Sequence, residues 1–321
     1  MEAQAGDNVC RPETELAAWS AWLRRRKAEG TAVKWTAHLA VFVEWCREVS
    51  VDDLTDVTAD QIENGFLAWW ADRFDRLYGR PAADKTQVGL HNALSSFFGW
   101  LDRAERGPAR NPMNRVERPV VRRKRIDSLS ADELERLLVD GPGRPQQRIV
   151  VWLLRWTGLR VGEATALLQR DVDLDAGWIY VRASKTSAGV RDLPIFPELR
   201  PELERWLAHL RTRGLLDAHR PFLTTRCGTA MTEQQVSKAL KLAAARAGVR
   251  LHRDRDRVGV NNHAAVSPHT LRRSFATDLL NRGLDVESVS RLLGHSSVVV
   301  TQQAYAELRW TTVAARALAV A

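Results

Sequence analysis

Apolar residues recur at three- and four-residue steps along most of the chain, the spacing typical of amphipathic helices. In the first third this pattern predicts four helices, over residues 13–27, 31–49, 58–77 and 82–106. The third opens with Thr58 and Gln61, a capping-box pair whose side chains can satisfy the first free backbone N–H groups. Gly107 and Pro108 end the fourth. We therefore predict an N-terminal helical bundle, with most of its seven tryptophans in the core.

A second capping box, Ser130 with Glu133, opens another set of elements. The apolar spacing predicts helices over residues 131–139, 146–157, 161–169, 198–213, 232–247, 268–281, 285–293, 298–305 and 307–319. Apolar and polar residues alternate over 178–183 and again over 191–195, which predicts a small β-hairpin or meander. The expected fold is mainly α: a helical bundle followed by a mostly helical α+β domain with a small antiparallel sheet.

The segment between these two parts has no apolar period and contains two prolines. Residues 110–127 carry seven basic and two acidic side chains, a net charge of +5. A basic run, Arg122, Arg123, Lys124 and Arg125, lies near its end. We expect domains over 1–112 and 128–321 joined by a basic linker over 113–127. This linker is either a solvated spacer or a strap across a phosphate backbone, and its composition fits both.

Composition narrows the class of protein. A chain of 321 residues with a net charge of +9 is typical of a two-domain globular protein with a polyanionic partner. The positive charge is unevenly distributed along the chain, because residues 1–109 carry 13 basic and 17 acidic side chains. No apolar run approaches the ~20 residues of a membrane span, and the N-terminus is polar, so we expect a cytoplasmic protein without a membrane partner. The three cysteines lie far apart, which disfavours a disulfide scaffold or a zinc site.

Motifs for nucleotide binding, zinc proteases and serine hydrolases are absent, but residue types that bind phosphate recur in the second half. Arg160 follows a glycine turn at a predicted helix start, with Glu163 one turn later on the same face. Lys185 lies in the predicted hairpin turn, in a chain with 41 arginines and only seven lysines. His269 and Arg272 share a helix face. Taken singly, each has an ordinary structural interpretation as a surface or turn residue.

Two further residues complete the set. His295 closes the stretch Leu-Leu-Gly-His, and Tyr305 is the only tyrosine after residue 180. In this order, Arg160, Lys185, His269, Arg272, His295 and Tyr305 resemble the catalytic signature of the tyrosine recombinases, the phage integrase family. The stretches TGLRVGEATAL, SPHTLRRSFATDLL and LLGHSSVVVTQQAY are similar to that family's consensus. The resemblance extends over roughly residues 15–321.

The resemblance implies a site-specific DNA recombinase. Tyr305 would attack a DNA phosphodiester and form a 3′-phosphotyrosyl intermediate with a free 5′-hydroxyl. Arg160 and Arg272 would clamp the phosphate, and Lys185 would protonate the leaving oxygen. His269 would contact the phosphate and help to take the phenol proton, His295 would donate to a non-bridging oxygen, and Glu163 would orient the site. The resemblance implies no metal, ATP or nucleotide cofactor.

It also implies how DNA is held. The bundle would be a SAM-like core-binding domain that closes around double-stranded DNA together with the catalytic domain. The expected DNA contacts outside the active site are two basic patches, Arg24, Arg25, Arg26 and Lys27 in the bundle and Arg122, Arg123, Lys124 and Arg125 in the linker. The assembly would be a homo-tetramer, or one completed by a related recombinase, with accessory DNA-bending or directionality proteins. Residues 309–321 would pack on a neighbouring protomer or on their own domain.

Three features depart from the family pattern. Tyr305 lies ten positions after His295 where nine are usual, Arg273 replaces a frequent second histidine, and the polar segment 252–265 is longer than typical. The offset before Tyr305 keeps a non-catalytic DNA-binding relative open as an alternative. A nicking-closing enzyme similar to type IB topoisomerases, which would use the same chemistry without strand exchange, is a second alternative. Within the leading interpretation, integration or excision of a mobile element and resolution of replicons are equally compatible with the sequence.

Overall fold

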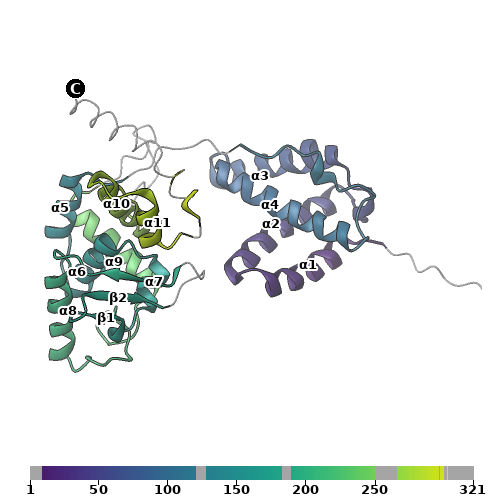
Figure 1. Ribbon diagram of the computed structural model, residues 1–321. Helices are drawn as coiled ribbons and strands as arrows, with labels where there is room; N and C mark the ends of the chain where they lie inside the picture. The colour runs from purple at the N-terminus through teal and green to yellow at the C-terminus, as the bar shows by residue number, and fades with distance from the viewer. Residues whose placement is uncertain are drawn as a thin grey trace, which may run out of the picture. The chain divides into compact units, whose positions relative to one another are not determined.

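The computed structural model describes residues 9–120, 128–182, 189–249, 266–295, 297–299 and 302. The chain divides into two compact units, Met1–Lys124 and Arg125–Ala321 (Figure 1). Among the described residues, no helix is both long enough and apolar enough to cross a membrane. The functional division into a core-binding domain, a linker and a catalytic domain stays a prediction.

The N-terminal unit is a bundle of four main helices. These are α1 (Pro12–Arg26), α2 (Glu29–Glu48), α3 (Leu67–Tyr78) and α4 (Asp84–Arg103), with short 3-10 turns at Leu54–Asp56 and Pro112–Asn114. A π-helical stretch, Gln61–Phe66, leads into α3. The predicted capping box is present, because the Gln61 N–H donates to Thr58 Oγ1 at 3.2 Å and the Thr58 N–H donates to Gln61 Oε1 at 2.8 Å.

Aromatic side chains fill the centre of this bundle. Trp19 and Phe42 are fully buried, and the Phe42 and Phe66 rings meet edge to face with centroids 5.0 Å apart. The prediction that most of the tryptophans belong to the core holds for three of the seven: Trp19, Trp45 and Trp70 are buried, whereas Trp22, Trp35, Trp69 and Trp100 pack against the core while partly exposed. The partly exposed rings form cation–π contacts with basic side chains. For example, the Arg106 guanidinium lies 4.7 Å from the centroid of the Trp100 ring.

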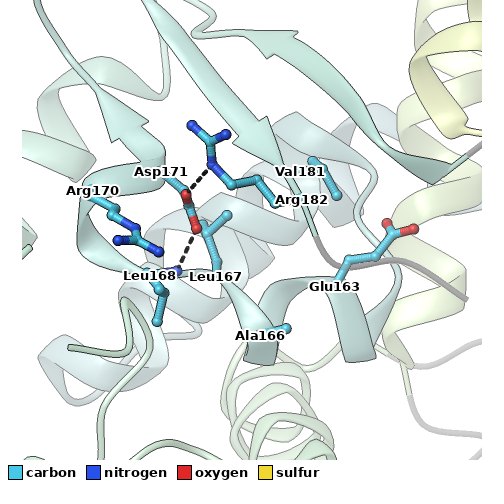
Figure 2. Close-up of a pocket in the computed structure, with 8 residues that line it drawn as sticks. All are labelled: Glu163, Ala166, Leu167, Leu168, Arg170, Asp171, Val181 and Arg182. Carbon is cyan, nitrogen blue, oxygen red and sulfur yellow. Dashed lines mark hydrogen bonds and ion pairs between the residues drawn. The ribbon is translucent and has the colours of Figure 1, made fainter. Parts of the chain in front are cut away.

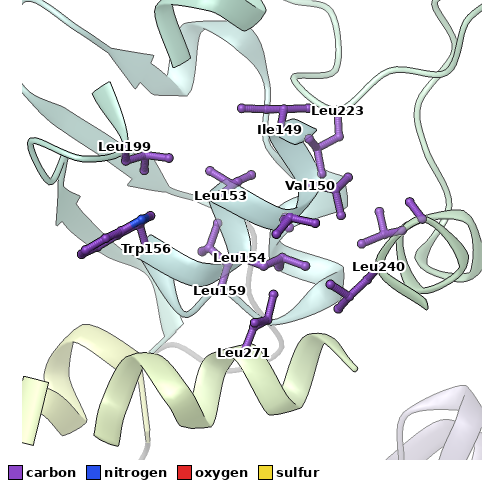
Figure 3. Packing of buried hydrophobic residues seen from close by; sticks show 14 of the residues in the cluster. Ile149, Val150, Leu153, Leu154, Trp156, Leu159, Leu199, Leu223, Leu240 and Leu271 are labelled. Atoms are coloured by element: carbon purple, nitrogen blue, oxygen red, sulfur yellow. The ribbon is translucent and has the colours of Figure 1, made fainter. Parts of the chain in front are cut away.

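The C-terminal unit is built around one buried helix. Its described helices are α5 (Ala131–Val139), α6 (Pro145–Thr157), α7 (Val161–Ala166), α8 (Arg200–Thr212), α9 (Glu233–Arg246), α10 (Pro268–Asn281) and α11 (Val286–Leu293). Helix α6 packs against α5, α8, α9 and α10. Figure 3 shows Val150, Leu153 and Leu154 of α6 among apolar residues of its neighbours. The predicted capping box opens α5, since the Glu133 N–H donates to Ser130 Oγ and the Ser130 N–H donates to Glu133 Oε2.

A three-stranded antiparallel sheet lies beside these helices, in the order β1 (Val172–Asp173), β2 (Trp178–Val181), β3 (Arg191–Pro194). The sequence predicted the last two strands but not β1, because two residues are too few to show an alternating pattern. Val181 pairs with Arg191 at the end of the β2–β3 ladder. The chain between these two residues contains Lys185, which lies outside the described residues.

The prediction of one helix over residues 161–169 is wrong, because α7 ends at Ala166. Leu167 and Leu168 adopt extended backbone instead. The Leu167 carbonyl accepts from the Phe222 N–H at 2.7 Å, and the Asp171 carboxylate accepts from the Leu168 N–H at 3.0 Å. These partners outside the helix replace the helical hydrogen bonds, and a 3-10 turn, Gln169–Asp171, follows.

Candidate active site

Arg160 stands at the N-terminus of α7, two residues after Gly158, which ends α6 with φ +58°. The Glu163 carboxylate, one helical turn later, accepts two hydrogen bonds from Arg160. Oε1 accepts from the Arg160 guanidinium at 2.7 Å, and Oε2 accepts from the Arg160 backbone N–H at 2.9 Å. The contact expected from the sequence is therefore present. It leaves Arg160 about one-third exposed, with its side chain oriented by a buried carboxylate.

Glu163 also binds a second arginine. The side chain of Glu163 is 3% exposed, and its Oε2 accepts from Arg191 Nη2 at 3.1 Å. Burial by itself raises the pKa of this carboxyl group, but the hydrogen bonds and charges of Arg191 and Arg160 outweigh it and lower the pKa from 4.5 to about 2. The carboxylate is therefore ionised at neutral pH and is a permanent negative charge between two cations.

Arg272 lies on α10 and is 3% exposed. Its Nη1 donates to the Gly158 carbonyl at 2.6 Å, and its Nη2 donates to the Leu293 carbonyl. His269 lies three residues earlier, in the first turn of α10, and is exposed. The helix starts there because Ser267 caps it and Pro268 occupies its first position. The same face of α10 thus carries two candidate catalytic residues, the buried Arg272 and the exposed His269.

The last turn of α11 is where the arginines meet. Three successive carbonyls accept from three different guanidinium groups: Leu292 from Arg191 Nε at 2.6 Å, Leu293 from Arg272, and Gly294 from Arg160 Nη2 at 2.7 Å. The last carbonyls of a helix have no partner within the helix and carry partial negative charge. Each carbonyl therefore binds one cation, and the helix end holds the three guanidinium groups in fixed relation to one another.

His295 follows Gly294, whose left-handed backbone (φ +64°) ends α11. The pKa of His295 is lowered from 6.5 to about 4, first by burial and then by the positive charges of Arg272, Arg160 and Arg191, with His269 contributing least. At neutral pH the imidazole is therefore uncharged, with one nitrogen that donates and one that accepts a hydrogen bond. It is a neutral hydrogen-bonding group among arginines.

The structure thus brings together Arg160, Glu163, Arg272 and His295, with His269 on the same helix face as Arg272. Two predicted catalytic residues, Lys185 and Tyr305, lie outside the described residues, as do the linker patch Arg122, Arg123, Lys124 and Arg125 and the segments 252–265 and 309–321. Arg24, Arg25, Arg26 and Lys27 are exposed at the end of α1 in the other unit.

Sequence reasoning missed Arg191. Its side chain is 8% exposed and contacts both Glu163 and α11. The sequence marked it only as the first residue of a predicted strand. An arginine at a strand start is common on protein surfaces, so no local signal distinguished it.

A pocket of about 130 Å³ is lined by residues of α7, of β2 and of the segment between α7 and β1 (Figure 2). Of the candidate residues that the structure describes, only Glu163 lines it. Inside the pocket the Asp171 carboxylate accepts from Arg182 Nε at 2.8 Å. The pocket contains one ion pair and several apolar side chains, and the converging arginines do not line it.

Replacing Gly158 with alanine should damage this site through packing. A Cβ at residue 158 would lie 2.5 Å from Phe275 Cδ1, and the backbone has positive φ. We expect the free energy of unfolding to fall by about 2–5 kcal/mol, the sum of left-handed strain and overpacking. Gly248→Ala is the matched control, because its φ is +62° and nothing lies within 4 Å of its Cβ position. Equal losses in calorimetric melts of the two variants would contradict the prediction.

Comparison with known proteins identifies the class to which this site belongs. Residues 127–311 match the model of the phage integrase family. The chain is 36% identical over 280 residues to the tyrosine recombinase XerA of Thermococcus kodakarensis, covering 86% of this chain and 84% of that protein. It is 32% identical over 241 residues to the tyrosine recombinase XerD of Shewanella oneidensis, covering 73% of each.

Solved structures share the fold. A lambda integrase tetramer bound to a Holliday junction superimposes with a TM-score of 0.71 at 19% identity, covering 92% of this chain and 78% of that one. The XerH recombinase bound to its difH substrate gives a TM-score of 0.63 at 20% identity, covering 95% and 84%. The chain therefore belongs to the phage integrase family of tyrosine recombinases, enzymes that break and rejoin DNA strands at specific sites.

Proposed function

We propose that Arg160, Arg272 and His295 bind the scissile phosphate of a double-stranded DNA recombination site. One observation carries the proposal: arginines from separate elements converge on the last turn of α11. Three guanidinium groups against the single Glu163 carboxylate give these four side chains a charge of +2, with His295 neutral. A phosphodiester is an anion of the kind that guanidinium forks match.

In the proposed reaction Tyr305 is the nucleophile. Its phenol oxygen forms a bond to phosphorus, and the bond from phosphorus to the 5′-oxygen breaks, which leaves a 3′-phosphotyrosyl linkage and a 5′-hydroxyl. The reverse reaction, with the 5′-hydroxyl of a second strand as nucleophile, rejoins the DNA. Each step exchanges one phosphate ester for another, so the total number of ester bonds stays constant and the step consumes no nucleotide.

The proposed reaction needs two proton transfers, one from the attacking phenol oxygen and one to the leaving 5′-oxygen. His269, together with the phosphate, takes the proton from the Tyr305 phenol, and Lys185 donates a proton to the leaving 5′-oxygen. Arg160 and Arg272 stabilise the negative charge that builds on the non-bridging oxygens. His295 donates its single N–H to one of these oxygens. Glu163 keeps Arg160 oriented toward the phosphate.

The wider DNA contacts follow from clusters of positive charge. We assign the N-terminal unit to core binding, with Arg24, Arg25, Arg26 and Lys27 on the phosphate backbone, and the linker patch Arg122, Arg123, Lys124 and Arg125 to the same role. Binding through such contacts weakens steeply as salt increases. The working assembly is a tetramer on two duplexes, an inference supported by the lambda integrase tetramer on a Holliday junction. Its proposed biological task is integration or excision of a mobile element, or resolution of replicons.

A nicked suicide DNA tests this function, because loss of the short 5′-hydroxyl fragment prevents rejoining and traps the covalent intermediate. Fragments of the DNA that flanks the gene, each carrying a nick, serve as substrates. We expect an SDS-resistant adduct at one position, and recombinant products when two copies of that site are supplied. Absence of any adduct would contradict the proposal. Nicking and closing without strand exchange would instead indicate an enzyme similar to type IB topoisomerases.

A further inference from the structure

Arg191 joins three parts of the C-terminal unit with one guanidinium group. Its Nε donates to the Leu292 carbonyl at 2.6 Å, Nη1 to the Gly189 carbonyl at 2.7 Å and Nη2 to Glu163 Oε2 at 3.1 Å. These partners belong to the end of α11, to the connection before β3 and to α7. All three guanidinium nitrogens are therefore engaged, and the side chain is 8% exposed.

Two of these contacts, to Glu163 and to Leu292, lead to residues that the proposed function uses. Glu163 Oε2, which Arg191 binds, also accepts from the Arg160 backbone N–H, while Oε1 binds the Arg160 guanidinium. Leu292 lies two residues before Gly294, whose carbonyl accepts from Arg160, and three before His295. A shift of Arg191 would therefore move both the carboxylate that orients Arg160 and the helix end that carries His295.

We propose that Arg191 is a positioning residue of the recombination site, which sets the places of Arg160 and His295 by holding Glu163 and the last turn of α11 together. This inference rests on the proposed function. Arg191 contacts the positioning groups and is not itself assigned to the phosphate. Its planar fork is essential, because a lysine ammonium is a single point of charge that cannot reach three acceptors in one plane.

Two variants separate the geometry of Arg191 from its charge. Arg191→Lys keeps the charge and loses the fork, whereas Arg191→Gln loses both. Arg148→Lys is the matched control in the same unit, since Arg148 also forms a fork, at 2.7 and 2.8 Å, with the buried carboxylate of Glu202 between α6 and α8. Neither Arg148 nor Glu202 contacts Glu163 or α11 in any hydrogen bond of the described residues.

The first measurement is the rate of adduct formation on the suicide DNA at saturating protein. We expect Arg191→Lys to be about 10²-fold slower, because misplacement by about 1 Å has that cost, while its affinity for the same DNA stays unchanged. Arg148→Lys should melt earlier than wild type yet cleave at the wild-type rate. A wild-type rate for Arg191→Lys, or an equal loss for Arg148→Lys, would overturn the inference.

The second measurement needs no activity. Among the described residues, the positive charges that lower the pKa of His295 are, in decreasing order, those of Arg272, Arg160, Arg191 and His269. Removing one of these positive charges should raise the pKa of His295, so an NMR titration of the free protein should show a higher value in Arg191→Gln and the wild-type value in Arg148→Lys. An unchanged pKa in folded Arg191→Gln would place Arg191 away from the site and overturn the inference.

If wild type forms no adduct, the proposed function fails, while this titration still decides the role of Arg191. If Arg191→Gln does not fold, the adduct rate of Arg191→Lys decides it alone.

Discussion

Tyr305→Phe is expected to abolish the covalent intermediate. The change removes a single oxygen, which is the atom that would bond to phosphorus, and it leaves the ring in place. No other group of the proposed site can form a phosphotyrosyl linkage, so adduct on the nicked suicide DNA should fall below detection, a loss of at least about 10⁴-fold on the scale known for removal of a nucleophile. DNA affinity should stay near that of wild type, since the phosphate contacts come from other residues.

Tyr180→Phe is the matched control for this experiment. Tyr180 lies in β2, where Arg182 covers its ring at 5.3 Å, and no role in the site is assigned to it. This variant should form adduct at the wild-type rate. A full yield of adduct from Tyr305→Phe would remove Tyr305 from its role. The one-residue offset between His295 and Tyr305 would then mark a real departure from the family pattern.

Arg272→Gln is expected to give the second largest effect. The lost guanidinium would take away the phosphate clamp of α10, and removal of one such preorganised donor lowers rates by about 10²–10³-fold. It would also leave the Gly158 and Leu293 carbonyls without their donors in the interior. Each buried acceptor left unpaired costs about 1–3 kcal/mol, so the protein should also melt earlier. Adduct formation and calorimetric melting together measure both effects.

A second buried arginine distinguishes lost chemistry from lost stability. Arg155 is 5% exposed and pairs with Asp278 at 2.6 Å, and among the described residues it forms no hydrogen bond to α11. Arg155→Gln should therefore destabilise the unit to a similar extent and still form adduct at a temperature where both variants are folded. Comparable loss of adduct in the two variants would show that Arg272 acts through folding alone.

Local features of this chain were readable without coordinates. The Thr58 and Ser130 capping boxes, the starts of α7 and α10, and the contact between Arg160 and Glu163 all involve residues three or four positions apart, where helix geometry decides the contact. The two errors in the predicted elements, the missing strand β1 and the overlong helix at α7, arise where a local pattern is too short or is overruled by a distant partner. Strand β1 is two residues long, and α7 ends early because Leu167 pairs with Phe222, a partner that no local pattern can reveal.

Sequence by itself determined most of the described helices, two of the three strands, the basic charge and the order of the phosphate-binding residues, because periodicity and capping are short-range properties. Only the tertiary structure decided that the last turn of α11 collects three arginines, and that Arg191 is one of them. Those hydrogen bonds join residues 134, 101 and 21 positions apart. Contacts over such separations depend on how α7, β3 and α10 are placed around α11, and that packing is a property of the whole folded unit.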